Sequence, residues 1–232
     1  MKLHSRYVTH LGINFITIPV PVISHQTNLL FQQAVISHGL EFIRTENPKN
    51  QIVLTRESPS PLQVTVSVLE PQVGQVLVVA PNPKVSLELF IQEAEAALEA
   101  FEEVWSAQGR QIIRCDATIR ELHETTSKHA FQELWEQRLG QSSQALATFG
   151  RPIRGGGLRF VMDPLPNETE PIQIEVKIES FLRDTTKIFV ESQFIWSMPT
   201  PPGTPLDVRG RLSQMNSYIQ SQVYSFLSGE TK

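Results

Sequence analysis

Residues 61–69 read PLQVTVSVL, and residues 171–182 read PIQIEVKIESFL. In both stretches apolar residues alternate with polar ones, which is the period of a strand that is buried on one face only. Both stretches also begin with proline and carry glutamine two positions later. We therefore predict two equivalent β-strands, one in each half of the chain.

The elements around these two strands recur in the same order. Each half is predicted to contain a strand, a helix, three strands and a second helix, and the stretch Gly39–Ile43 resembles Gly157–Val161. We interpret this order as an internal duplication, with residues 1–109 as the first repeat half and residues 110–232 as the second half of one structural domain. A repeat of this length indicates a duplicated half-domain rather than a solenoid, which needs several short units.

Runs of antiparallel-type strands between helices indicate the α+β class. We expect one antiparallel sheet with helices packed on one face. The opposite face is then predicted to present polar side chains, namely Thr65, Ser67, Glu175, Lys177, Glu191 and Gln193. Further strands are predicted at Tyr7–Ile18, Leu40–Arg44, Gln51–Thr55, Gln75–Ala80, Leu158–Met162 and Lys187–Met198.

The clearest helical pattern lies between Asn82 and Gly109. Asn82 is expected to cap this helix and Pro83 to occupy its first position, where a missing N–H costs nothing. Its apolar seam recurs at steps of three and four residues: Leu87, Ile91, Ala94, Leu98, Phe101 and Trp105. Further helices are predicted over Ser24–Ser37 and Lys128–Phe149, and after a capping box formed by Thr204 and Asp207.

The composition limits the function classes. With 232 residues, 40% hydrophobic and 19% charged, the chain is typical of globular proteins and is not wholly disordered. A net charge of -4 makes nucleic-acid binding unlikely. Pro19 and Pro21 interrupt the N-terminal apolar stretch, and no run reaches the roughly 18 apolar residues of a membrane span. We expect a cytoplasmic protein without membrane association.

The whole chain resembles a sporadically distributed family of uncharacterised bacterial proteins. The resemblance rests on four short stretches: Leu98–Glu102, Ile112–Ile119, Gly157–Phe160 and Val208–Leu227. The chain departs from the family at residues 11–14, where an acidic opening strand is usual. The resemblance implies a soluble bacterial protein with two layers, and it implies no catalytic residue.

The segment from Arg151 to Arg159 is the strongest candidate for a binding site. Residues 137–162 hold four arginines and three consecutive glycines, and they contain no acidic residue. Glycine N–H groups can form a nest that holds an anion, and arginine binds phosphate or carboxylate with two hydrogen bonds. The predicted anion-binding residues are Arg138, Arg151, Arg154, Gly155, Gly156 and Arg159. The alternative is a connecting loop with solvated arginines.

The remaining chemistry-bearing residues are interpreted as structural. Cys115, the one cysteine of the chain, lies on the buried parity of a strand. His123, Glu124 and His129 do not have the one-turn spacing of a zinc-binding histidine pair, so no metal site is predicted. The glutamates of the helix between Asn82 and Gly109 are expected to form a solvated face: Glu88, Glu95, Glu99 and Glu102.

No nucleotide-binding or nucleophile motif is present in the sequence. We therefore hypothesise a non-enzymatic binding or assembly module that uses no cofactor and binds a protein partner or a second copy of itself. Three alternatives stay open: an anion or nucleotide sensor at the segment Arg151–Arg159, a nucleic-acid binder at the same segment, and a hydrolase with dispersed residues.

Overall fold

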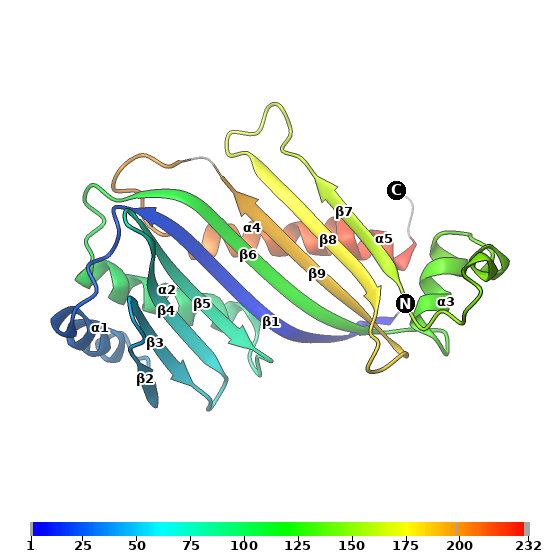
Figure 1. The fold of residues 1–232 in the computed structure, drawn as a ribbon, viewed down its shortest axis with the longest axis horizontal. Helices are drawn as coiled ribbons and strands as arrows, with labels where there is room; N and C mark the ends of the chain where they lie inside the picture. The colour runs from blue at the N-terminus through cyan, green and yellow to red at the C-terminus, as the bar shows by residue number, and fades with distance from the viewer. Residues whose placement is uncertain (1, 198, 230–232) are drawn as a thin grey trace.

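The computed structural model describes residues 2–197 and 199–229. Nine strands form one sheet in the order β2-β3-β4-β5-β1-β6-β9-β8-β7, and neighbouring strands are antiparallel throughout (Figure 1). The strands are β1 (Lys2–Ile18), β2 (Arg44–Glu46), β3 (Gln51–Arg56), β4 (Leu62–Glu70), β5 (Val73–Pro81), β6 (Gln111–Glu124), β7 (Gly157–Met162), β8 (Ile172–Ser180) and β9 (Lys187–Trp196).

The helices α2, α4 and α5 lie on one side of the sheet, behind it in Figure 1. The α-helices are α1 (His25–Ser37), α2 (Leu87–Val104), α3 (Ala130–Gln132), α4 (Val208–Tyr218) and α5 (Tyr224–Ser228). Two π-helical turns, η1 (Glu133–Arg138) and η3 (Ile219–Val223), and a 3₁₀ segment, η2 (Ser143–Phe149), complete the set. The predicted combination of helices with an antiparallel sheet is confirmed.

The central pair of strands, β1 and β6, joins the two halves of the chain. Outward from this pair the first half runs β1, β5, β4, β3, and the second half runs β6, β9, β8, β7. The two orders correspond position by position, as the duplication would require, although the duplication itself stays a prediction. The first half adds β2 at its edge, and within the described residues no strand occupies the corresponding place beyond β7.

The strands form where the sequence alternates, because one parity is buried under the helices. Along β9, Ile188, Val190, Phe194 and Trp196 are buried, and the residues between them are half-buried or small. The seam of α2 is buried in the same core from Ile91 to Phe101. The predicted end of the β9 strand at Met198 lies outside the described residues.

The predicted continuous helix over Lys128–Phe149 is wrong. The helical run stops after Arg138, and Gly140 has a left-handed φ of 60°, which ends the helix and redirects the chain. The indole of Trp135 then donates to the Ser142 carbonyl, and the Ser142 hydroxyl accepts from the Gln144 N–H at the start of η2. Apolar residues at helical spacing therefore occupy two short segments rather than one helix.

Three predicted boundaries also move. Asn82 has a positive φ of 47° and does not cap α2; the hydroxyl of Ser86 does, accepting from the Leu89 N–H at 3.2 Å. The start of α4 is capped by Asp207, which accepts from the Gly210 N–H, and no reciprocal box with Thr204 forms. Of the predicted strand Leu40–Arg44, only its last residue is part of β2.

Candidate binding surface at the β7 edge

The predicted arginine segment leads directly into β7, the last strand of the sheet. Arg151 and Arg154 are exposed and form no ion pair with any described residue. Arg159, on β7, instead forms a two-bonded ion pair with Glu175 of β8, at 2.8 and 2.7 Å. Arg138 lies half-buried against the Gly229 end of α5. The structure therefore brings part of the predicted site to one edge but does not gather all four arginines.

The glycines of this segment allow close packing. None of Gly155, Gly156 and Gly157 has a positive φ, so the backbone here lacks the alternating handedness of an anion nest. The Gly156 N–H donates to the Ser180 hydroxyl at 3.0 Å, and a Cβ on Gly156 would lie 2.8 Å from the ring of Phe131. These contacts give the glycines a structural role, and their proposed binding of an anion stays a prediction.

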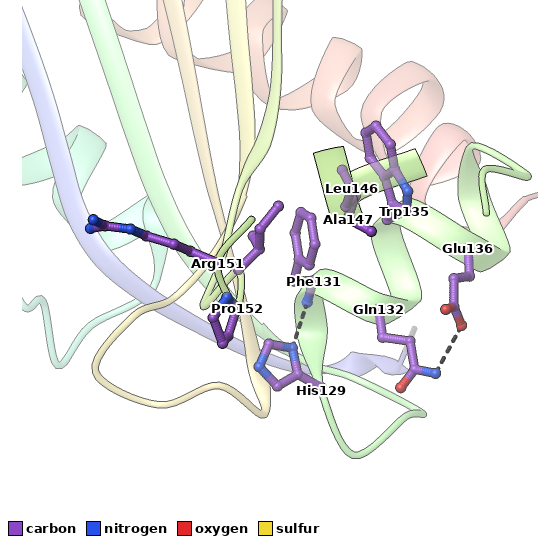
Figure 2. Close-up of a pocket in the computed structure, with 10 residues that line it drawn as sticks. His129, Phe131, Gln132, Trp135, Glu136, Leu146, Ala147, Arg151 and Pro152 are labelled. Atoms are coloured by element: carbon purple, nitrogen blue, oxygen red, sulfur yellow. Dashed lines mark hydrogen bonds between the residues drawn. The ribbon is translucent and has the colours of Figure 1, made fainter. Parts of the chain in front are cut away.

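A pocket of about 430 Å³ lies beside the arginine segment, between it and the helical turns of residues 129–149 (Figure 2). Phe131 and Trp135 are stacked in it, with ring centroids 6.0 Å apart. Figure 2 shows Arg151 extending away from these two rings, so its guanidinium does not point into the pocket. The Gln132 amide donates to Glu136 at 2.8 Å. The pocket therefore offers an aromatic wall without a converging cation.

The edge strand β7 exposes apolar side chains. Phe160 is 38% exposed on the helix side of β7, and Phe226 of α5 is 40% exposed next to it, whereas Val161, 51% exposed, lies on the opposite face of the strand. The rings of Phe160 and Phe226 meet edge to face with centroids 5.5 Å apart. Aromatic side chains carry much of the binding energy at protein interfaces, so their exposure together marks this edge as a candidate interaction surface.

An apolar cavity of about 450 Å³ opens between this edge and the last helix. Its lining combines strand residues with residues of α4, η3 and α5, including Met162, Val176, Ile178, Tyr218, Val223 and Phe226. The π-helical turn η3 supplies Gln222 and Val223. π-Helical turns inside α-helices often occur at functional sites. The sequence analysis did not identify this cavity, because it depends on which strand ends the sheet.

The uncovered face of the sheet carries a row of ionisable side chains that begins on β1 and runs across the second half. Five residues in direct register cross five strands: His10, Arg120, Glu191, Lys177 and Arg159. Arg120 and Lys177 both bind the Glu191 carboxylate. Burial opposes the ionisation of Glu191, but these two cations outweigh it and hold the pKa of its carboxyl below the usual range. The charges of the row therefore largely satisfy one another.

The same face of the first half carries no charged side chain on the register-matched positions of β3, β4 and β5. These positions are Thr55, Gln63, Val79, Val53, Thr65, Leu77, Gln51, Ser67 and Gln75. Thr65 and Ser67, which were predicted to face outward, lie on this face but are buried. Neighbouring amides cover them: Gln63 donates to Thr65 and Ser67 donates to Gln75, at 3.1 and 2.9 Å.

A buried polar cluster on the helix side of β6 was not predicted. The Glu121 carboxylate forms an ion pair with Arg6, accepts from the Tyr224 hydroxyl at 2.8 Å and contacts His123 Nε2 at 3.1 Å. Burial would raise the pKa of Glu121, but these partners outweigh it and lower that pKa. Arg6 and Tyr224 are far apart in sequence, so no spacing signal links them. Glu121 and His123 are buried while Arg6 is partly exposed, and we interpret the cluster as structural.

The other candidates are placed as follows. Cys115 is buried, and burial raises the pKa of its thiol far above the usual range, which keeps it protonated and unreactive. The predicted glutamate face of α2 is only partly solvated. Arg209 of α4 binds both Glu88 and Glu95, and the buried guanidinium of Arg110 binds Glu102.

Within residues 2–197 and 199–229, no three His, Cys, Asp or Glu side chains group as metal ligands would. In the same ranges every helix is too short or too polar to cross a membrane.

No family model and no curated protein matches the chain. Among solved structures, the chain is similar to the T6SS immunity protein TplEi from Pseudomonas aeruginosa, in a complex with the "L" peptide. The TM-score is 0.23 and the identity 12%, over 93% of this chain and 90% of that one. A likeness this slight indicates neither a shared fold nor a shared role.

Proposed function

We propose that the protein is a non-enzymatic module that binds a protein partner, and that the β7 edge is its binding surface. The observation that carries this proposal is the pair of exposed aromatic side chains at the last strand, Phe160 and Phe226, whose rings are in contact. The apolar cavity beside them provides the concave surface that interface hot spots occupy.

The positions of the reactive side chains support the non-enzymatic part of this proposal. Cys115 and His123 are both buried, and His123 is engaged with Glu121. A nucleophile and its base need access to substrate. The exposed arginines, by contrast, lie beside the apolar edge, where they can contribute charge to an interface rather than to a reaction.

Site-specific photo-crosslinking tests the proposal. A benzophenone side chain is introduced at Phe226 or, as a matched control, at Leu89 of α2, since both residues are 40% exposed. In cells that contain the natural partners, irradiation should join a discrete polypeptide to position 226 and not to position 89. Equal labelling at both positions, or no adduct at position 226, would contradict the proposal.

An anion-binding role is the second candidate, because Arg151 and Arg154 are exposed and unpaired within the described residues. Phosphate, ATP, GTP and a short oligonucleotide should be compared by melting temperature, since a ligand that binds only the folded state raises it. Arg151→Ala with Arg154→Ala should remove any rise. A response to the oligonucleotide alone, with steep salt dependence, would indicate nucleic acid.

We also propose that the two halves arose by internal duplication. The matching strand orders on either side of β1 and β6 support this origin. Superposition of residues 7–107 on 111–227 should align the strands in order.

A further inference from the structure

The outer side of β7 has unpaired backbone groups. The Ser180 N–H donates to the Gly156 carbonyl, which makes these two residues a hydrogen-bonded pair of the antiparallel ladder. Because such pairs alternate, the N–H and C=O groups of Gly157, Arg159 and Val161 point away from β8. In the part of the chain that the structure describes, no other strand pairs with them.

Side chains on the other parity of β7 face the helices. Leu158, Phe160 and Met162 lie on this side, and Phe160 and Met162 line the apolar cavity. A strand added beside β7 would lie about 4.8 Å away, with its side chains about 5 Å from their cross-strand neighbours. Its residues on the helix side would therefore contact Phe160 and Phe226 at the mouth of the cavity.

Arginines without ion-pair partners stand at the start of this edge. Arg154 and Arg151 precede β7 and form no ion pair among the described residues, whereas Arg159 on β7 already binds Glu175 with two hydrogen bonds. A carboxylate on an added strand could bind the guanidinium groups of Arg154 and Arg151, which favour two-bonded contacts. This end of the edge therefore complements an acidic segment.

A second copy of the chain complements this edge less well. If two β7 strands paired antiparallel through their outward groups over residues 157–161, Arg159 of one copy would lie directly opposite Arg159 of the other. Like charges in that position destabilise a sheet. The register that places Arg159 opposite Val161 keeps an overlap of the same length, but β7 carries no carboxylate that could pair with the arginines of the other copy.

We infer that the β7 edge accepts an extended acidic and apolar segment of a partner protein as a tenth strand of the sheet. The inference rests on the proposed function and specifies the partner. Alternate apolar side chains of the segment pack over Phe160 and Phe226, and its acidic side chains contact Arg154 and Arg151. Backbone hydrogen bonds supply affinity, and the cavity and the arginines supply specificity.

A displayed library of random twelve-residue peptides tests this inference on the full chain. Selection should enrich peptides in which apolar residues alternate with others and acids are frequent. Val161→Pro removes an outward N–H while leaving the ladder to β8, so it should weaken the enriched peptides at least tenfold. The double variant Arg151→Glu with Arg154→Glu should do the same, whereas Arg44→Glu at the opposite edge should not.

Amide hydrogen exchange provides a second measurement that does not depend on a variant. When an enriched peptide binds, exchange at Gly157, Arg159 and Val161 should slow at least tenfold, because their N–H groups become hydrogen-bonded. Unchanged exchange at these three amides in the saturated complex would overturn strand addition even if the peptide binds tightly.

The outcomes separate the inference from the proposed function. Peptides that bind folded Val161→Pro as tightly as the unaltered chain would overturn the inference and leave the module's protein-binding role intact. Failure to enrich any peptide would also overturn it, while crosslinking at position 226 still decides the proposed function. A dimer of the unaltered chain in sedimentation, lost in Val161→Pro, would assign the edge to a second copy and overturn the inference.

Discussion

The aromatic side chains on the helix side of the two halves are enclosed to different degrees. In the first half Phe101 of α2 is 1% exposed and packs on Trp105, and Phe31 of α1 packs on the same indole with ring centroids 5.4 Å apart. In the second half, Phe226 of α5 is 40% exposed beside Phe160 of the edge strand. One aromatic cluster is therefore enclosed within the chain, and the other stays accessible.

The segments that follow the two central strands account for this difference. After β1, the chain forms α1, which packs on α2. After β6, it forms α3, which contacts β8 and β9 instead. The short edge strand β2 is also charged, with Arg44 paired to Glu46, a common way to prevent edge-to-edge association. Under the proposed function, the accessible β7 edge serves partner binding and not folding.

The largest expected effect separates the two aromatic positions. Phe101→Ala should lower the free energy of unfolding by about 3–5 kcal/mol, because it leaves a cavity in a closed core. Phe226→Ala should lower it by about 1 kcal/mol, since that ring already contacts solvent. Urea denaturation of both variants measures the difference. Equal losses would mean that Phe226 is as enclosed as Phe101.

A second comparison concerns two largely buried glutamates that form ion pairs, Glu121 with Arg6 across the two halves and Glu93 with Arg56 within the first half. Glu121→Ala should cost about 3 kcal/mol, because it leaves Arg6, His123 and the Tyr224 hydroxyl without their shared acceptor. Glu93→Ala in the first half should cost less, about 1–2 kcal/mol, since its partner Arg56 keeps a hydrogen bond to the Ser60 carbonyl.

Acid pH provides the check on Glu121. Its pKa is lowered in the folded state, so its contribution to stability is present above the usual glutamate range and is lost as the pH falls through the lowered folded pKa. The difference between the unaltered chain and Glu121→Gln should therefore shrink below about pH 4.5. A difference that grows with acid would show that Glu121 is protonated in the folded chain.

Parts of this architecture follow from the sequence. The strands around Pro61–Leu69 and Pro171–Leu182 were predictable because the face of each that packs under the helices is apolar while the other face is mostly polar, which leaves a period of two. The exposed position of β7 at the edge of the sheet was not predictable, because the alternation in Leu158–Met162 does not show whether another strand lies beside it. The charge of the arginine segment predicts a binding site, but its aromatic neighbour Phe226 is more than 60 residues away in the chain.

Helix ends were also hard to predict from composition alone. Asn82 and Ser86 are both suitable caps, and only the left-handed backbone at Asn82 excludes it. Likewise, the apolar spacing of Lys128–Phe149 suits a helix, but Gly140 allows a turn that local pattern does not require. In both cases the local sequence is compatible with two conformations, and the fold as a whole determines which of them forms.

His10 lies where the charged row of the second half meets the uncharged first half. Burial lowers the pKa of His10 to about 4. The nearby charge of Arg120 lowers this pKa further, and Glu191 partly opposes the shift. The unfolded chain therefore takes up a proton first as the pH falls from 6.5 toward 4, and the folded state loses about 2 kcal/mol across that window. His10→Gln should flatten the stability profile there. An unchanged slope would show that His10 titrates normally.

The smallest expected effect tests whether the open faces of the two halves are held together differently. Lys177 and Glu191 are 2.8 Å apart in the second half, and Ser67 and Gln75 are 2.9 Å apart in the first. Double-mutant cycles to alanine should give a coupling of about 0.5–1 kcal/mol for each pair. Raising the salt concentration to about 1 M shortens the screening length to about 3 Å, so the coupling of the charged pair should fall by about half while that of the neutral pair stays constant. Salt-independent coupling in both halves would show that Lys177 and Glu191 interact through hydrogen-bond geometry alone. The uncovered faces of the two halves would then differ in composition but not in the electrostatic strength of their contacts.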